Sequence, residues 1–134
     1  SFDGCTLSGN TATLGGAVAA LYGPEVTFED SVVTANTAEY GGGLLAIDGD
    51  HACTSSSSSA THGIYANEAD SAGGGVYLYN LSTYSPTFSG TDCDMGTSAG
   101  GYDNDPDDVD WYSGTGSSSY GSNADPSCSS GSCS

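Results

Sequence analysis

The chain of 134 residues contains no lysine and no arginine, against 17 aspartate and glutamate residues. Because phosphate binding depends on cationic side chains, this composition excludes nucleic acid as a partner and argues against anionic membrane surfaces. No apolar run approaches the roughly 18 residues of a membrane span, so we expect no membrane insertion. The absence of basic residues favours an extracellular or cell-surface location, where divalent cations offset carboxylate repulsion. The alternative is a merely acidic surface.

Leucine is also scarce, whereas glycine is abundant with 21 residues, so residues that favour helices are few. This composition argues against a leucine-rich repeat, which needs a leucine-rich helical segment on its outer side. The segments between turns are short and β-prone, as in residues 25–34 and 75–79. Apolar and polar residues partly alternate in them, as half-buried strands require.

One pattern occurs three times along the chain. An aliphatic residue stands three positions before the asparagine of Asn-x-Ala, and Gly-Gly-(Ala/Gly) with a further aliphatic residue follows. The asparagines are Asn10, Asn36 and Asn67, which lie 26 and 31 residues apart, and a weaker copy places Gly96 at this position 29 residues later. A period of this size is typical of a solenoid. The sequence therefore predicts an all-β fold, a parallel β-helix of about four to five coils. A β-sandwich with glycine-rich turns would not explain the registration of Asn-x-Ala with the Gly-Gly pair that follows it.

Stacked coils bring equivalent residues into columns about 4.8 Å apart. The asparagines are predicted to form an amide ladder, and Gly96 is expected to interrupt it near the end of the stack. Three apolar columns are predicted to fill the core: Leu7, Val33, Ile64 and Cys93; Val18, Leu44 and Val76; Phe2, Phe28 and Phe88.

The same pattern resembles the repeat of the polymorphic outer membrane proteins, which also occurs in large secreted right-handed β-helix proteins of bacteria and algae. The resemblance covers residues 1–102 and implies right-handed coils. It implies less about function, because members of the family serve as adhesins, passenger domains and envelope proteins. Residues 103–134 are more loosely similar to segments that close some of these proteins. We therefore expect an acidic turn and a capping tail there.

The five cysteines suit an extracellular protein. Cys128 and Cys133 enclose four Ser and Gly residues and are predicted to form a local disulfide that pins the tail; a metal site is the alternative. Cys53 and Cys93 are expected to be buried free thiols. Since five is an odd number, at least one thiol stays unpaired or bonds a neighbouring molecule. Cys5 is the candidate for an inter-subunit bond.

Two further features concern ligands and modification. Five carboxylates lie within eight residues, at Asp103, Asp105, Asp107, Asp108 and Asp110. Their density suits Ca²⁺, which takes six to eight oxygen ligands; the alternative is a solvated loop in which Asp105-Pro106 ends the last coil. Ca²⁺ is the only cofactor we consider. Asn80-Leu81-Ser82 is a glycosylation sequon, which could equally stay unmodified, and the Ser/Thr run at residues 54–59 is a candidate for O-glycans.

The first hypothesis for function is a self-assembling structural protein. The chain starts at Ser1 directly before a repeat-position Phe2, which suggests a processed or excised piece. The first coil would expose an unpaired edge, covered either by further coils of a longer parent or by another subunit. We expect the first coil, residues 2–18, to stack on the last coil and tail of the next copy, residues 88–120. Such head-to-tail contacts would give a homopolymer, as a fibre or surface layer.

The second hypothesis is a cell-surface adhesin or passenger-type module that binds glycans. Six aromatic residues could stack on sugars or pack within the protein: Tyr77, Tyr79, Tyr84, Tyr102, Trp111 and Tyr112. Catalysis is not expected. Pectate lyases use Arg or Lys, which are absent, and the carboxylates that could serve a glycosidase gather in a terminal loop. His51 and His62 are expected at the surface or at corners.

Overall fold

The computed structural model describes residues 1–56, 62–81, 85–96, 102–113, 116–120, 127–129 and 132–133. For Ser113 and the last three of these ranges only the backbone is described. These residues form strands and turns. Among them there is no helix, and so none long and apolar enough to cross a bilayer. The expected all-β class is therefore confirmed.

The strands belong to four sheets of six, five, three and two strands. In chain order they are β1 (Phe2–Asp3), β2 (Thr6–Ser8), β3 (Val18–Ala20), β4 (Val26–Glu29), β5 (Val32–Thr34), β6 (Thr37–Tyr40), β7 (Leu44–Ile47), β8 (Asp50–Thr54), β9 (Gly63–Tyr65), β10 (Glu68–Ala72), β11 (Val76–Asn80), β12 (Thr87–Thr91), β13 (Val109–Ser113), β14 (Gly116–Tyr120), β15 (Ser127–Ser129) and β16 (Ser132–Cys133).

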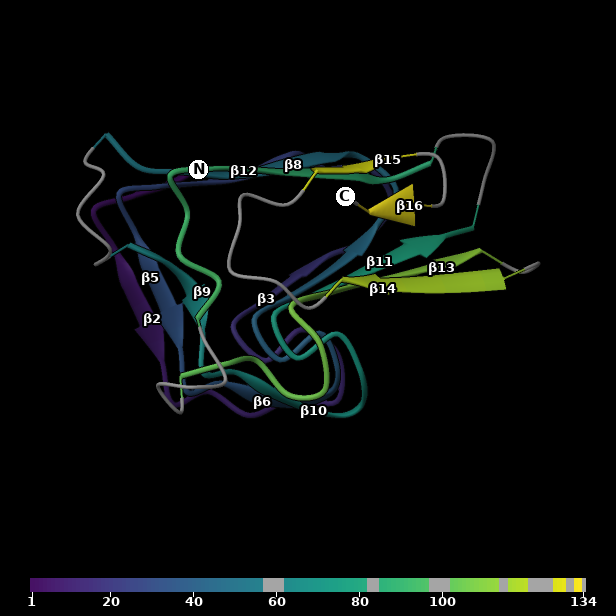
Figure 1. Cartoon of the computed structure of the whole chain (residues 1–134), viewed down its shortest axis with the longest axis horizontal. Helices are drawn as coiled ribbons and strands as arrows, with labels where there is room; N and C mark the ends of the chain where they lie inside the picture. The colour runs from purple at the N-terminus through teal and green to yellow at the C-terminus, as the bar shows by residue number, and fades with distance from the viewer. Residues whose placement is uncertain are drawn as a thin grey trace.

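The chain visits the sheets repeatedly in one order, which Figure 1 shows as strands of different colours lying side by side. Strands β4, β5, β6 and β7 belong to the six-, three-, two- and five-stranded sheets, and β8, β9, β10 and β11 repeat that order. We call each such passage a circuit. Equivalent strands of successive circuits pair in parallel. The first and fourth circuits have isolated bridges in place of some strands.

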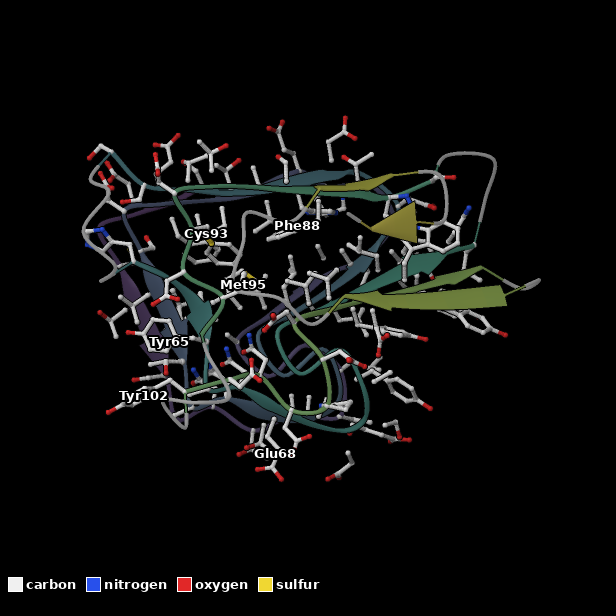
Figure 2. The ribbon with its side chains drawn as sticks, viewed as in Figure 1. Tyr65, Glu68, Phe88, Cys93, Met95 and Tyr102 are labelled. Atoms are coloured by element: carbon white, nitrogen blue, oxygen red, sulfur yellow. A yellow bond between two sulfur atoms is a disulfide. The ribbon has the colours of Figure 1, made fainter. Side chains whose placement is uncertain are left out.

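The register agrees with most of the predicted columns. Val33 pairs with Leu7 on one side and Ile64 on the other. Leu44 likewise pairs with Val18 and Val76. The core is built from these inward positions, as Figure 2 shows around Phe88 and Met95. Leu7 and Val18 of the first circuit are only partly buried.

The fourth circuit departs from the predicted register. Gly63 bridges Asp94 in parallel, so Met95 follows in line with Ile64, and Met95 is fully buried. The expected fourth member of this column, Cys93, is therefore wrong. The pairing of the last circuit also continues to Ser113 on β13, which is beyond the boundary expected after residue 102.

Cys93 is instead joined to Cys53 in a disulfide, with their Cα atoms 5.7 Å apart. The expectation of two buried free thiols is wrong. Cys53 stands opposite Phe28 in the register, and Cys93, two residues before Met95, lies close enough to bond it. The bond covalently links the third and fourth circuits.

The phenylalanine column is only partly correct. Phe2 and Phe28 are register partners and their rings stack with centroids 5.3 Å apart. Phe88 pairs with His51, and His51 pairs with Val26. Phe88 is therefore displaced by two residues from the predicted column, although it still points into the core with 1% exposure. His51 is also buried, at 2%, and is not the surface or corner residue that we expected.

Glycines allow the close approach of successive circuits at one corner. Gly41 has a φ of +67°, which is costly for other residues. A Cβ on the next residue, Gly42, would lie 2.5 Å from the carbonyl oxygens of Glu68 and Gly74 in the following circuit. The Gly-Gly signature therefore reflects backbone packed against backbone.

Candidate functional site

The asparagines form the ladder expected from their spacing. Asn10 Nδ2 donates to Asn36 Oδ1 at 2.9 Å, and Asn36 Nδ2 donates to Asn67 Oδ1 at 2.9 Å. Each Oδ1 also accepts the backbone N–H of the preceding rung. Asn36 and Asn67 are almost completely buried. The ladder thus satisfies polar groups inside a core that water does not reach.

The ladder continues to Asn104 and does not stop at Gly96 as expected. Asn67 Nδ2 donates to Asn104 Oδ1 at 3.1 Å, and Asn104 Nδ2 donates to Asp108 Oδ1 at 2.8 Å. Asp108 is 1% exposed and occupies the place where the next asparagine oxygen would lie. A buried carboxylate therefore ends the ladder on the C-terminal side.

The N-terminal side of the stack is open within the described residues. Strands β1, β2 and β3 each stand at the end of their sheet's strand order. Asn10 is exposed, and its Oδ1 accepts no hydrogen bond from the described part of the chain. Large apolar side chains are also exposed in this circuit or directly after it, with Leu14 and Leu21 at 43% and Tyr22 at 77%.

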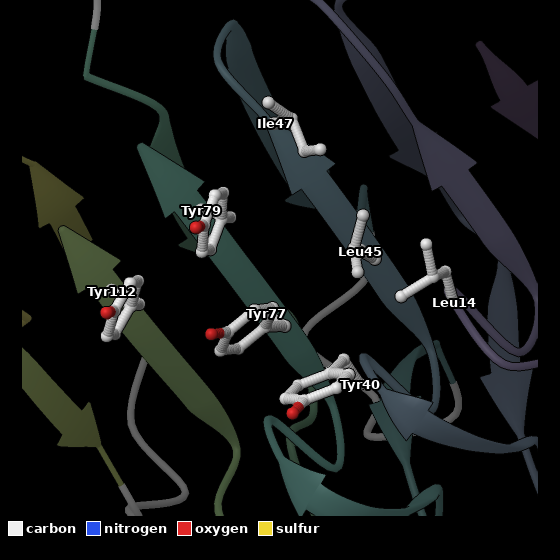
Figure 3. A pocket seen from close by; sticks show the side chains of 7 residues that line it. All are labelled: Leu14, Tyr40, Leu45, Ile47, Tyr77, Tyr79 and Tyr112. Atoms are coloured by element: carbon white, nitrogen blue, oxygen red, sulfur yellow. The ribbon is translucent and has the colours of Figure 1, made fainter. Parts of the chain in front are cut away.

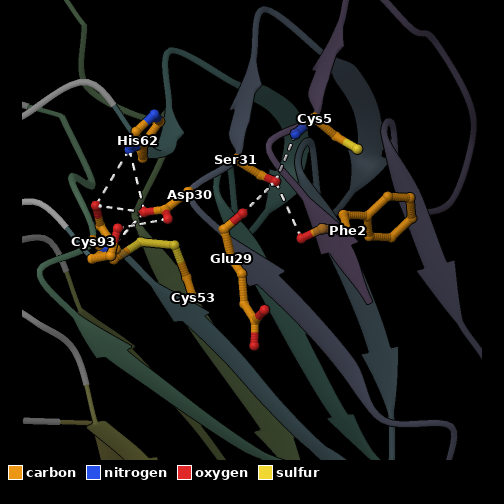
Figure 4. Close-up of polar contacts among 10 residues, drawn as sticks. Phe2, Cys5, Glu29, Asp30, Ser31, Cys53, His62 and Cys93 are labelled. Atoms are coloured by element: carbon orange, nitrogen blue, oxygen red, sulfur yellow. Dashed lines mark hydrogen bonds and ion pairs between the residues drawn. A yellow bond between two sulfur atoms is a disulfide. The ribbon is translucent and has the colours of Figure 1, made fainter.

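This end also carries little charge. Residues 1–24 contain one of the 17 acidic residues, Asp3, and the other 16 lie in residues 25–134. Ser31 joins the first circuit to the second, because its Oγ accepts the backbone N–H of Cys5 at 3.0 Å and lies 3.2 Å from the carbonyl oxygen of Phe2 (Figure 4). Cys5 is a free cysteine and partly buried.

The opposite end carries strands of reversed direction. β14 pairs antiparallel with β13, and β15 pairs antiparallel with β12. The tail therefore lies against two strands of the last circuit. The backbone register places Cys128 directly opposite Cys133. Their side chains lie outside the described residues, so the disulfide between them stays a prediction.

The acidic residues proposed for Ca²⁺ have separate environments. Asp105 is exposed, Asp108 belongs to the ladder, and Asp110 Oδ2 accepts the backbone N–H of Gly73 at 2.9 Å. Asp103 and Asp107 are half-buried. In the described ranges no group of three or more His, Cys, Asp or Glu side chains could hold a metal ion. A calcium site in this turn stays a prediction.

A groove of about 510 Å³ lies on the outer face of the five-stranded sheet (Figure 3). We call it the tyrosine groove and define it by its lining residues: Leu14, Tyr40, Leu45, Ile47, Tyr77, Tyr79 and Tyr112. Alternation along β7, β11 and β13 explains it, because the residues between the inward core positions point outward. The register sets Tyr79 between Ile47 and Tyr112, and Tyr77 between Leu45 and Asp110.

The tyrosines form a continuous aromatic band. Ring centroids are 5.3 Å apart for Tyr40 and Tyr77, 6.2 Å for Tyr77 and Tyr79, and 5.2 Å for Tyr79 and Tyr112. Burial and the neighbouring phenols of Tyr40 and Tyr79 raise the pKa of Tyr77 to about 12. Burial also raises the pKa of Asp110, against the opposing effect of the Gly73 N–H. Both shifts indicate a poorly hydrated surface.

The other aromatic candidates for sugar stacking lie elsewhere. Trp111 points into the core with 5% exposure, and its Nε1 is buried without a hydrogen-bond partner. Tyr102 is 63% exposed but does not line the groove. Tyr84 lies outside the described residues. The structure therefore brings Tyr77, Tyr79 and Tyr112 together and adds Tyr40, which the sequence analysis missed because it lies at the end of β6.

A polar cluster surrounds Asp30, as Figure 4 shows. Asp30 accepts hydrogen bonds from the backbone N–H and Oγ of Ser56, both at 2.7 Å, and these bonds lower its pKa. His62 Nδ1 lies 3.6 Å from Asp30 and 3.3 Å from Ser55 Oγ. Since one nitrogen faces both groups, His62 does not relay a proton from the serine to the carboxylate. The cluster instead anchors the start of the serine-rich segment.

Asn80 is half-buried at the end of β11, and its Nδ2 donates to Ser85 Oγ at 3.1 Å. Ser82, which completes the sequon, lies outside the described residues, as do residues 57–59 of the serine run. Glycosylation at both places stays a prediction.

Comparison of the chain with protein-family models, with curated proteins and with solved structures gave no match. The site must therefore be interpreted from its own geometry.

Proposed function

We propose that the chain is a right-handed parallel β-helix of the kind found in the polymorphic outer membrane proteins and in secreted β-helix proteins. The repeated circuit through four sheets supports the β-helix. The right-handedness of the coils is inferred from the resemblance of the repeats and from the strong general preference of parallel crossovers for right-handed connections.

We further propose that the protein is an extracellular structural subunit without catalytic activity, which assembles end to end. The observation that carries this proposal is the open first circuit, where three strand edges and the ladder oxygen of Asn10 lack partners in the described chain. Another subunit placed there continues the backbone hydrogen bonds of the sheets. The low charge of residues 1–24 keeps repulsion at this contact small.

Further coils of a longer chain would also cover this edge. Of the two, we propose that another subunit covers it. Head-to-tail contact, with the first circuit against the tail of the next copy, gives a fibre or surface layer. Cys5 is a free cysteine of the first circuit, and an inter-subunit bond from it would use Cys128 or Cys133 of the next copy's tail, in place of the predicted bond between those two residues. The disulfide between Cys53 and Cys93 supports an oxidising, extracellular compartment.

Sedimentation velocity and negative-stain electron microscopy of the chain test this assembly. We expect oligomers or fibres that grow with concentration. Thr6→Glu with Ser8→Glu puts two carboxylates on exposed positions of β2 and should give monomers. The matched control, Ser71→Glu with Leu81→Glu, adds the same charge at exposed positions of the third circuit, outside both proposed contact segments, and should still assemble. A wild-type chain that stays monomeric at all concentrations would refute the assembly.

A second candidate function is that of a surface adhesin or passenger-type module. The tyrosine groove favours it, because a recognition site needs a preformed, partly apolar concavity with a few polar groups.

A further inference from the structure

We propose that the tyrosine groove binds an extended, uncharged polysaccharide that lies across β13, β11 and β7. This inference does not depend on end-to-end assembly. It rests on the second candidate function, for which it names a ligand class.

The chemistry of the lining is the first argument. All seven lining side chains are tyrosine, leucine or isoleucine, so the groove offers apolar surface together with four phenol hydroxyls. Tyrosine combines a rigid apolar ring with a hydrogen-bonding group at its tip. A sugar chain has the same two properties, since C–H groups cover the faces of each ring and hydroxyls line its edges. The lining therefore matches a carbohydrate better than a purely apolar ligand.

The distribution of charge is the second argument. The protein has a formal charge of −17, yet the seven lining side chains are tyrosine, leucine or isoleucine, none of which is charged at neutral pH. The field of the whole protein repels polyanions such as uronates and sulfated glycans. An uncharged ligand reaches the groove without this penalty.

The same charge argues against a second copy of the chain as the occupant. Two copies that faced each other across the groove would bring 17 acidic residues each and no basic residue to compensate them. Asp110 stands next to Tyr77 in the register, so two such carboxylates would come close at the interface. Burial already disfavours the ionised form of Asp110.

The shape of the groove is the third argument. Its lining comes from all four circuits, from Leu14 in the first to Tyr112 in the fourth. Successive strands lie about 4.8 Å apart. Tyr79 and Tyr112, on the paired strands β11 and β13, have ring centroids 5.2 Å apart, in agreement with that step, and Tyr77 and Tyr40 extend the band along β11 and onto β6. A linear chain can therefore contact several tyrosines at once.

Affinity electrophoresis tests the proposal on the whole chain. The strongly acidic protein migrates readily in native gels, and a neutral polysaccharide in the gel leaves the field unchanged. The probes are four uncharged polymers (hydroxyethylcellulose, β-1,3-glucan, galactomannan and neutral xylan) and one anionic polymer, polygalacturonate. We expect at least one uncharged polymer to retard the wild type, with no retardation by polygalacturonate.

Variants locate the binding. Tyr79→Ala with Tyr112→Ala removes the stacked pair and should weaken binding about tenfold or more. If this variant melts early, Tyr79→Phe with Tyr112→Phe keeps both rings, removes two hydroxyls and should weaken binding about threefold or more. Tyr22→Ala removes a tyrosine that is 77% exposed outside the groove, and it should bind as the wild type does.

Three results would overturn the proposal: no retardation by any uncharged polymer, equal retardation by polygalacturonate, or unchanged binding by well-folded alanine and phenylalanine variants. Sedimentation of the same variants identifies a different occupant. If the alanine pair lost self-association while no polysaccharide bound, the groove would be a contact between copies and the ligand assignment would be wrong. A failure of end-to-end assembly is detected separately, by sedimentation of the wild type and of the β2 variant Thr6→Glu with Ser8→Glu.

Discussion

Removing one rung of the asparagine ladder should destabilise the protein by an amount that depends on the rung's position. Asn67 is 1% exposed, and its side chain makes five hydrogen-bond contacts. It accepts from the backbone N–H and Nδ2 of Asn36, and its Nδ2 faces the carbonyl oxygens of Val33 and Tyr65 and the Oδ1 of Asn104. Asn67→Ala removes all of these contacts.

The cost follows from the groups left behind. The backbone N–H of Asn36 and the carbonyl of Val33 lose buried partners, and each unsatisfied group costs about 1–3 kcal/mol. We therefore expect the free energy of unfolding to fall by about 4 kcal/mol, a large part of a typical total of about 5–15 kcal/mol. Asn10→Ala is the matched control. Asn10 is exposed, and Asn36 Oδ1 keeps the bond from the backbone N–H of residue 10, so the loss should be about 0.5–1 kcal/mol.

Urea unfolding monitored by fluorescence gives both values. Trp111 is the only tryptophan and is buried, so its emission should change on unfolding. Asn67→Asp is a further variant of equal size. It keeps the oxygen that accepts from Asn36, but it replaces the donor Nδ2 by a second oxygen, which then faces three acceptor oxygens. Its loss should equal or exceed that of Asn67→Ala. Equal losses for Asn10→Ala and Asn67→Ala would refute the ladder as a source of stability.

Three further predictions concern the core. Replacing Cys53 and Cys93 by serine opens a link across 40 residues and should cost about 4 kcal/mol; reductant should then lower the melting temperature of the wild type by more than that of this variant. Val33→Asp buries an unpaired charge at a position with 0% exposure and should cost several kcal/mol; an unchanged melting temperature would show that the column is assigned wrongly. Burial lowers the pKa of His51 below 6.5, so the unfolded chain binds more protons as the pH falls through about 6.5, and stability should decline there. His51→Leu should flatten this pH dependence; an unchanged pH profile in this variant would contradict the assignment to His51.

The parts of the fold that repeat could be predicted from the sequence. Asn10, Asn36 and Asn67 each stand three positions after an aliphatic residue. This fixed spacing predicted both the ladder and the columns that contain Val33 and Leu44. Such positions are constrained by neighbours on both sides, so the same residue type recurs. The groove could not be predicted in the same way, because its tyrosines lie at different places in their circuits and meet only after the sheet has formed.

The last circuit could not be predicted because its corners differ in length. Eight residues separate Met95 from Asn104, whereas two separate Ile64 from Asn67. The spacing rule therefore selected Gly96 and Cys93, which lie at the expected distance from Asn67 but in the wrong register. Asn104 could not be found by spacing either, because it stands five residues before Val109, whereas Asn10 and Asn36 stand eight residues before Val18 and Leu44.

The two ends of the stack differ in ways that limit how copies can meet. The N-terminal end has one acidic residue in 24 and an open ladder oxygen, whereas the C-terminal end has five carboxylates between residues 103 and 110 and a ladder ended by Asp108. Contact between two C-terminal ends would bring the exposed or half-buried carboxylates of this turn, Asp103, Asp105 and Asp107, closer together with no lysine or arginine to balance them. Every junction should therefore include at least one N-terminal end. Head-to-tail contact meets this condition at each junction and can repeat without limit, which is why it favours a fibre.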